Sequence, residues 1–357
     1  MEIFKEMQKR GHEQVIFNYD KASGLKAIIA IHDTTLGPAL GGCRMLPYSS
    51  EDAALEDVLR LSEGMTYKAA AAGLDFGGGK AVIVGDPATE KTEAMFRALG
   101  RFIETLHGRF STGEDVGTTG DDFVYSLRET KHLVGLPEAY GGAGDTGDIT
   151  AVGVINAMHA ALMYRFGTPS LEGRKIAIQG LGKVGYHVAK RAVEEGASVV
   201  AADINPQLVG KTVSELGVEP ADPWAILETE CDVLAPCALG NVVNEDTIEK
   251  FRCEIVAGSA NNQLKDLTYG DRLQARGITY APDFITNAGG LIQVADEVQG
   301  YRSERVQHQV DNIYDLLLNI FHKAEATGRS TVAIAMQIVE ERLSLYHAIH
   351  RIYTQSP

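Results

Sequence analysis

The sequence has little of what a disulfide scaffold, a metal centre or a membrane span requires. Only four of its 357 residues are cysteines, and none forms a CxxC pair or lies at ligand spacing from a histidine. We therefore read them as buried apolar residues and expect no metal. No apolar run approaches the roughly 20 residues that span a bilayer, and the N-terminal stretch MEIFKEMQKRGHEQ is polar and amphipathic. These features predict a cytoplasmic protein with no membrane partner.

Positive charge is also scarce. The 33 Lys and Arg residues face 48 Asp and Glu residues, a formal charge of −15, and no basic patch is evident. Binding that depends on neutralising phosphates needs such a patch, so we expect no nucleic-acid partner. With 45% hydrophobic and 23% charged residues, the composition is that of a globular protein. At this length the chain exceeds what one core organises, and two domains are expected.

The first third alternates strand and helix signals. Short β-rich runs occupy residues 13–20, 24–33 and 41–48. Ser49 and Asp52 form an S-x-x-D helix start, and the apolar spacing that follows predicts a helix with Lys68 towards its C-terminal end. Further signals indicate a strand at 81–85, a helix at 92–108 and a short strand at 109–112.

The stretch LDFGGGKAVIVGDP places Gly77, Gly78 and Gly79 directly before Lys80. Glycine loses much backbone entropy on folding, so a triplet is tolerated where positive φ or close approach to the backbone is needed. A tight turn that leads into the strand is one expectation, and a backbone without side chains that lines the approach to the Lys80 ammonium is the other. Lys80, Lys68 and Asp115 could also converge to bind a small zwitterion, although each taken singly is typical of a solvated surface charge.

The second half changes pattern after residue 140. The glycine-rich stretch 140–148 suits a linker or hinge. A helix at 150–167 is followed by strands alternating with helices, which predicts a parallel sheet covered on both faces. The predicted strands are 174–180, 198–203, 232–238, 254–260 and 278–285. Two long amphipathic helices, about 310–326 and 331–353, end the chain.

Gly180, Gly182 and Gly185 have G-x-G-x-x-G spacing between a predicted strand and a predicted helix. There, free backbone N–H groups and the helix dipole favour a pyrophosphate. The next strand ends at Asp203, where a carboxylate can bind an adenosine ribose and repel a 2′-phosphate, so NAD is favoured over NADP. An unliganded glycine turn and a surface aspartate are the alternatives.

These segments resemble the glutamate, leucine, phenylalanine and valine dehydrogenase superfamily over nearly the whole chain. The matching stretches are LDFGGGKAVIVGDP, LGPALGGCRM, LRLSEGMTYK, EDVGTT, GLGKVG, APCALG, GSANNQL and NAGGLIQVADE. The resemblance implies an α/β protein of two domains with a cleft between them, and a homo-oligomer. We expect a substrate-binding and oligomerisation domain at 1–140, a hinge at 141–148, a Rossmann-type NAD domain at 149–327, and a C-terminal helix, 328–357, that returns towards the first domain.

The resemblance also implies roles for individual residues. Lys68 would bind the substrate α-carboxylate, Lys80 would be the general acid and base that activates water, and Asp115 would receive the amino proton and orient Lys80. Thr150 and Asn262 would contact the nicotinamide amide or the substrate. Gly41 and Gly42 would allow close approach at the carboxylate. The other implied contacts are Lys183, Val184 and Ala238 for the cofactor, together with Gly180, Gly182, Gly185 and Asp203, and Leu40, Gly113, Leu291 and Val294 for the side-chain pocket.

The implied reaction is reversible oxidative deamination of an apolar amino acid to a 2-oxo acid and ammonia. Several motifs are most similar to phenylalanine dehydrogenases, and Gly113, where leucine enzymes usually carry alanine, would leave room for a ring. GEDVGTT is closer to the leucine enzymes, and leucine or another branched-chain amino acid stays the second substrate. Asp148 departs from both groups, which have proline two residues before the threonine. An NAD-binding regulator without catalysis and a 2-hydroxy acid dehydrogenase are the alternatives of other classes.

Overall fold

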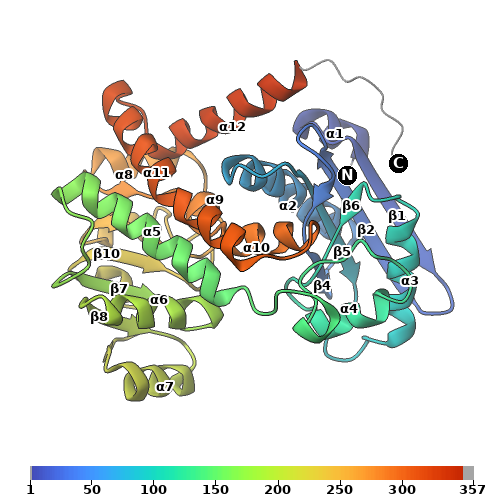
Figure 1. The fold of residues 1–357 in the computed structure, drawn as a ribbon, viewed down its shortest axis with the longest axis horizontal. Helices are drawn as coiled ribbons and strands as arrows, with labels where there is room; N and C mark the ends of the chain where they lie inside the picture. Colours follow the sequence, from blue (N-terminus) through green and yellow to red (C-terminus); the bar gives the residue numbers. More distant parts are fainter. Residues whose placement is uncertain (1, 349–357) are drawn as a thin grey trace. The chain divides into compact units, whose positions relative to one another are not determined.

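The computed structural model describes residues 2–348, which divide into two units (Figure 1). The N-terminal unit comprises the described residues up to Asp145, together with Val294–Tyr301 and the described residues from Ile338 onwards. The C-terminal unit comprises Thr146–Gln293 and Arg302–Gln337. No helix in the described chain is both long and apolar enough to cross a membrane.

A mixed six-stranded sheet forms the centre of the N-terminal unit. The order β1-β2-β5-β3-β6 is antiparallel from β1 to β5 and parallel beyond it, and β4 pairs in parallel with β5. The strands are β1 (Gln14–Asp20), β2 (Leu25–Asp33), β3 (Ala39–Leu40), β4 (Cys43–Leu46), β5 (Gly77–Val84) and β6 (Phe110–Ser111). The helices of this part of the chain are α1 (Ile3–Arg10), α2 (Glu51–Ala71), α3 (Glu93–Glu104) and α4 (Gly120–Ser126).

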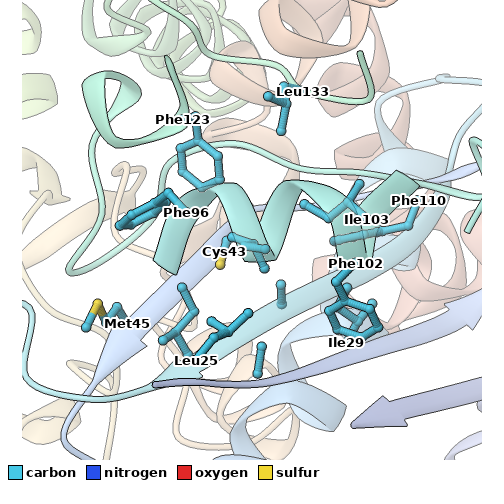
Figure 2. Packing of buried hydrophobic residues seen from close by; sticks show 14 of the residues in the cluster. Leu25, Ile29, Cys43, Met45, Phe96, Phe102, Ile103, Phe110, Phe123 and Leu133 are labelled. Atoms are coloured by element: carbon cyan, nitrogen blue, oxygen red, sulfur yellow. The ribbon is translucent and has the colours of Figure 1, made fainter. Parts of the chain in front are cut away.

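Both faces of this sheet are buried, which explains why β2 is an almost continuous apolar run. Successive side chains of a strand point to opposite faces. Ile29 belongs to the cluster formed with α3 and α4, while Ile28 packs with residues of α2. Figure 2 shows the first cluster, where the rings of Phe96 and Phe123 meet edge to face with centroids 5.7 Å apart. The sheet is therefore a fixed platform for residues on β4 and β5.

The C-terminal unit contains a parallel six-stranded sheet of order β12-β11-β10-β7-β8-β9. The chain adds β8 and β9 on one side of β7 and then crosses to β10 on the other. The carboxyl ends of β7 and β10 therefore form the topological switch point of this sheet. The strands are β7 (Lys175–Gln179), β8 (Ser198–Ala202), β9 (Glu219–Pro220), β10 (Cys231–Pro236), β11 (Cys253–Val256) and β12 (Thr279–Tyr280).

Helices cover this parallel sheet. One face packs against α8, and α5 and α6 contact its strands and each other (Figure 1). The helices that begin in this unit are α5 (Gly147–Phe166), α6 (Lys183–Glu194), α7 (Pro206–Leu216), α8 (Thr268–Ala275), α9 (Asp283–Thr286), α10 (Gly289–Glu297), α11 (Ser303–Thr327) and α12 (Thr331–His347). The α/β fold with a Rossmann-type second sheet is thus confirmed.

Several boundaries differ from the sequence predictions. Helix α2 is capped by Ser50, whose Oγ accepts a hydrogen bond from the Ala53 amide, so Ser49 is not the N-cap. Helix α5 begins at Gly147, which makes the last two residues of the predicted hinge helical. The strand predicted at 278–285 ends at Tyr280, because Pro282 lacks an N–H for the sheet and begins α9. The last residues predicted for the final helix, 349–353, lie outside the described residues.

Candidate active site

The glycine triplet is part of strand β5 and makes no turn, so the prediction of a turn before Lys80 is wrong. None of the three glycines has positive φ. A β-carbon on Gly77 would lie 2.0 Å from the Asp33 carbonyl oxygen, and one on Gly78 would lie 2.2 Å from the Thr66 amide nitrogen. At Gly79 it would meet the Phe110 ring at 2.7 Å. Glycine is required because neighbouring backbone and an aromatic ring occupy the positions that side chains would take.

Lys80 and Asp115 form a buried ion pair at this point of the sheet. Lys80 Nζ lies 2.5 Å from Asp115 Oδ2, and the two side chains are 8% and 20% exposed. A β-carbon on Gly42 would lie 3.3 Å from Lys80 Nζ and 2.9 Å from Asp115 Cβ. A β-carbon there would also lie 2.8 Å from the Glu114 carbonyl oxygen, so glycine at this position lets the backbone approach the pair closely.

The Asp115 carboxyl is held in its ionised form. Burial alone raises its pKa, but the Lys80 ammonium and the Arg44 guanidinium outweigh burial and bring the pKa below the ordinary value. Arg44 Nε lies 3.4 Å from Asp115 Oδ2. The sequence analysis missed Arg44. It stands two residues after Gly42 in GGCRM, and residues two apart in a strand lie on the same face, so its position could have indicated that it is near the site.

The structure positions the remaining residues of this half as follows. Leu40 is buried in β3, opposite Gly78 in the parallel register, and Gly41 packs so closely that a β-carbon would lie 1.8 Å from the Gly79 carbonyl oxygen. Lys68 is half-buried in the last turn of α2, which packs against β5 through Thr66.

The expected space at Gly113 is not there. A β-carbon on Gly113 would lie 2.2 Å from the Val134 carbonyl oxygen, so the backbone of 134 fills the position that alanine would need. The argument that Gly113 leaves room for an aromatic ring is therefore wrong. Val294 lies in the same unit, with Cγ1 4.0 Å from the position of a Gly135 β-carbon. Leu291 is buried in α10, in the part of that helix that belongs to the C-terminal unit.

The glycine-rich loop lies at the switch point of the parallel sheet, between β7 and α6. Gly180 has φ +95°, and a β-carbon there would lie 2.7 Å from Ala238 Cβ at the end of β10. A β-carbon on Gly185 would lie 2.0 Å from the Gly180 carbonyl oxygen, so loop and helix are in contact. Nothing lies within 4 Å of the same position on Gly182.

Gly182 is therefore the glycine that faces open space. It is the N-cap of α6, whose first two residues are Lys183 and Val184. A helix N-terminus carries amide donors and the positive end of the dipole. These residues fit the pyrophosphate of a dinucleotide, which needs close approach to the backbone at this point.

Asp203 follows β8, and its carboxylate connects the end of this strand to the glycine-rich loop through a hydrogen bond. Its Oδ2 accepts from the Leu181 amide at 2.7 Å and its Oδ1 from the Asn205 amide at 2.8 Å. Two large apolar side chains beside the loop were not predicted. Ile204 is 78% exposed and Leu239, next to Ala238, is 79% exposed, which suits an apolar ring system better than water.

Around the start of α5, the Thr150 hydroxyl donates to the Thr146 carbonyl at 2.7 Å, and a β-carbon on Gly290 would lie 2.9 Å from Thr150 Oγ1. Asn262 is exposed with φ +52°, and its carbonyl accepts from the Asn241 amide. Asn287, which was not predicted, is buried and donates to the Ser259 carbonyl at 3.0 Å. Its Oδ1 has no partner among the described residues.

Asp148, the departure from the family pattern, is held by helix α6. Both of its carboxylate oxygens accept from Arg191 Nη2, at 2.8 and 2.9 Å, and Oδ1 lies 3.3 Å from His187 Nδ1. Within the described chain, no group of three or more His, Cys, Asp or Glu side chains could hold a metal ion.

A parallel sheet with a glycine-rich loop at its switch point, together with a buried lysine and aspartate pair, defines a dehydrogenase that binds a dinucleotide. The chain belongs to the Glu/Leu/Phe/Val dehydrogenase family. Residues 12–132 match the model described as the Glu/Leu/Phe/Val dehydrogenase dimerisation domain, and residues 141–211 and 207–340 match the model described as glutamate/leucine/phenylalanine/valine dehydrogenase.

Similar proteins include dehydrogenases for several amino acids. The chain is 51% identical to a phenylalanine dehydrogenase of Thermoactinomyces intermedius, over 100% of this chain and 98% of that protein. It is also 51% identical to a leucine dehydrogenase of Bacillus cereus, over 96% and 94%. The crystal structure of an L-tryptophan dehydrogenase from Nostoc punctiforme has a TM-score of 0.84 at 42% identity, covering 97% of this chain and 99% of that one. The protein is an amino acid dehydrogenase that uses a nicotinamide cofactor.

Proposed function

We propose that the protein catalyses the reversible oxidative deamination of an apolar L-amino acid with NAD, giving a 2-oxo acid and ammonia. The observation that carries this proposal is the buried pair of Lys80 and Asp115, 2.5 Å apart beside the side-chain-free position at Gly42. A lysine whose ammonium faces one carboxylate can exchange a proton with a water or an amine placed next to it. The role proposed for each site residue is the one that the family resemblance implies, and this arrangement is consistent with it.

In deamination, Lys68 binds the substrate carboxylate, and Asp115, held as an anion, binds the substrate amine and takes up its proton. A nicotinamide cofactor, when bound, would supply the acceptor for the hydride of the substrate Cα. Lys80, as the free amine, takes the proton of the water that attacks the iminium carbon, and it returns a proton when ammonia leaves. Because only the free amine can act as a base, deamination should have an alkaline optimum.

For the substrate, we propose phenylalanine first and leucine or another branched-chain amino acid second. Apolar side chains at Leu40, Leu291 and Val294 support an apolar substrate. The preference for phenylalanine depends on motif resemblance alone, since Gly113 offers no extra space and relatives of equal identity act on either amino acid. A difference of one methylene changes selectivity by only about 1–3 kcal/mol. Initial rates with phenylalanine, tyrosine, tryptophan, leucine and methionine rank the candidates, and a higher kcat/KM for leucine contradicts the preference.

For the cofactor, we propose NAD over NADP. The Asp203 carboxylate at the end of β8 would accept from the ribose hydroxyls and would repel a 2′-phosphate. The exposed side chains of Ile204 and Leu239 could then cover the adenine ring. Comparison of kcat/KM for the two cofactors tests this, and equal use of NADP contradicts it.

We also propose that the N-terminal unit forms a homo-oligomer and that the glycine-rich linker is a hinge. Phe17 and Tyr19 are 54% and 67% exposed on β1, an edge strand of the sheet. Exposed apolar residues on an open strand edge favour pairing with a second copy. Light scattering gives the oligomeric state, and a monomer contradicts the first proposal. X-ray scattering with and without NADH and a substrate analogue tests hinge closure, which excludes water from hydride transfer.

Lys80→Ala tests the catalytic assignment. We expect turnover to be lost while NADH still binds, as measured by calorimetric titration. Lys91→Ala is the matched control, because Lys91 forms a similar 2.6 Å ion pair with Asp122 in the same unit, and it should retain turnover. Near-normal turnover in Lys80→Ala contradicts the role of Lys80.

Assays of the wild-type protein separate the alternatives from other classes. NADH consumption with phenylpyruvate only when ammonium is present supports the amino acid dehydrogenase. Consumption without ammonium indicates a 2-hydroxy acid dehydrogenase. NADH binding without turnover of any amino acid indicates a regulator.

A further inference from the structure

Arg44 connects the proposed catalytic pair to helix α2. It belongs to β4, and its side chain is 19% exposed. Its Nε lies 3.4 Å from Asp115 Oδ2, the oxygen that also faces Lys80 Nζ at 2.5 Å. On its other side, Nη1 donates to Asp57 Oδ2 at 2.9 Å. One guanidinium therefore bridges two carboxylates on different segments of the chain.

The second carboxylate is itself held in place. Tyr48 Oη donates to Asp57 Oδ2 at 2.8 Å, and Arg60 Nη2 donates to Asp57 Oδ1 at 3.0 Å. Asp57 belongs to α2, the helix that carries Lys68 in its last turn. Charges along this cluster alternate from Lys80 through Asp115 and Arg44 to Asp57, so each buried charge lies beside an opposite one.

Lys80 by itself does not hold Asp115 in one orientation. A lysine ammonium is a compact charge on a flexible stem, whereas the guanidinium of arginine is a rigid, planar group of donors. Arg44 is fixed by Asp57 at one end and by the β4 backbone at the other. Its Nε makes no hydrogen bond to Asp115, so it acts on the carboxylate, which follows β6 in a loop, as a fixed positive charge 3.4 Å from Oδ2 that favours the ionised form and this orientation.

We propose that Arg44 is a positioning residue for the dehydrogenase reaction, which holds Asp115 as an anion with Oδ2 directed at Lys80 Nζ, and that Asp57 holds Arg44 for this purpose. The proposal rests on the function proposed above. It predicts that loss of Arg44 affects the proton-transfer steps more than the binding of amino acid, because Arg44 contacts Asp115 and Asp57 and acts on the reaction through Asp115.

The test compares Arg44→Gln, Arg44→Lys and Arg60→Gln in the full-length protein. Arg60 is the matched control, because it is half-exposed and donates to Asp57 Oδ1, whereas Arg44 and Tyr48 donate to Oδ2 and remain in place without Arg60. In Arg44→Gln we expect kcat to fall by roughly 10²-fold, the effect of misplacing a catalytic group by about 1 Å, with KM for the amino acid changed less. The acid limb of the pH profile for reductive amination, at constant free ammonia, should move to higher pH, because Asp115 loses one of the two positive charges that keep its pKa low.

Rescue by the conservative variant separates positioning from a structural role. Arg44→Lys keeps the positive charge but lacks the rigid, planar guanidinium. Compared with Arg44→Gln, it should therefore return the acid limb to near its wild-type pH, while kcat recovers only in part. Arg60→Gln should keep kcat within about twofold of wild type. Thermal melting of each variant shows whether it is folded. If Arg44→Gln is poorly folded, the comparison is made on Arg44→Lys, whose kcat should still be lower than that of wild type and of Arg60→Gln.

Two outcomes overturn the proposal. The first is a folded Arg44→Gln, or the Lys variant in its place, with wild-type kcat. The second is an equal loss of kcat in Arg60→Gln. Failure of the proposed function is seen separately: the wild-type protein is then inactive with every amino acid, or Lys80→Ala is as active as wild type.

Discussion

Gly78 provides a direct test of the packing that surrounds Lys80. A β-carbon at this position would lie 2.2 Å from both the amide nitrogen and Oγ1 of Thr66 and 2.5 Å from the Ser62 carbonyl oxygen. Non-bonded heavy atoms pack at about 3.5–4.0 Å, so Gly78→Ala requires a displacement of about 1 Å or more. Two of the three contacts are backbone groups of α2, which cannot rotate away as the end of a long side chain could.

The cost of this displacement sets the expected size of the effect. Helix α2 is anchored on the sheet by buried residues such as Leu55, Val58 and Leu59, so its shift disturbs a packed core. Overpacking typically costs about 1–3 kcal/mol, and more when the structure cannot relax. For Gly78→Ala we expect a loss of about 3 kcal/mol in the free energy of unfolding. For a domain of this size, that corresponds to a melting temperature lower by roughly 6–12 °C.

Gly64→Ala is the matched control on the same helix. Gly64 is exposed, and nothing lies within 4 Å of the position of its β-carbon. Alanine in a helix interior is favoured over glycine by about 1 kcal/mol, so this variant should melt roughly 2–4 °C above wild type. Differential scanning calorimetry measures both. If Gly78→Ala melts within a degree of wild type, the conclusion that backbone contact requires glycine in β5 is wrong.

Three further predictions concern pH, the cofactor and the departure at Asp148. His12 is buried beside His32, and its pKa is lowered to about 4, first by burial and then by the second histidine. Below pH 6.5 the unfolded chain therefore takes up a proton that the folded chain does not, and stability is lost as the pH falls towards 4. His12→Gln should remove about 1.5 kcal/mol of the difference in unfolding free energy between pH 6.5 and 5. Gly182→Ala should melt like wild type, because its β-carbon meets nothing within 4 Å. It should weaken NADH binding by about tenfold or more in calorimetry, and unchanged affinity would show that no phosphate approaches Gly182. Asp148→Asn should lower the melting temperature by no more than about 2–4 °C, since its ion pair with Arg191 is half-exposed and worth at most about 1 kcal/mol. A larger loss of melting temperature would mean that the ion pair is essential to the fold.

The sequence by itself determined the local structure where one periodic signal dominates. The fingerprint at Gly180, Gly182 and Gly185 predicted a strand, a loop and a helix, and the structure has β7, the loop and α6 at these residues. Alternating strand and helix signals in the second half likewise predicted the parallel sheet. Such signals are local, because the spacing of apolar residues and the turn chemistry lie within one segment of chain.

Only the tertiary structure decided why particular residues stand where they do. From the sequence alone, the triplet at Gly77–Gly79 predicts a turn, because glycine favours turns. In the structure it belongs to a strand, and the approach of Asp33, Thr66 and Phe110 from elsewhere in the chain explains why these positions are glycine. Gly113 was misread for the same reason, since the group that fills its space belongs to Val134.

The only local signal for Arg44 was its position two residues after Gly42, which does not show what its side chain contacts. Those contacts were decided when folding brought β4, β5, α2 and the loop after β6 together, so that one guanidinium lies between Asp57 and Asp115. Local sequence encodes backbone preference, whereas close approach and charge pairing depend on segments that are far apart in the chain, and packing alone decides them.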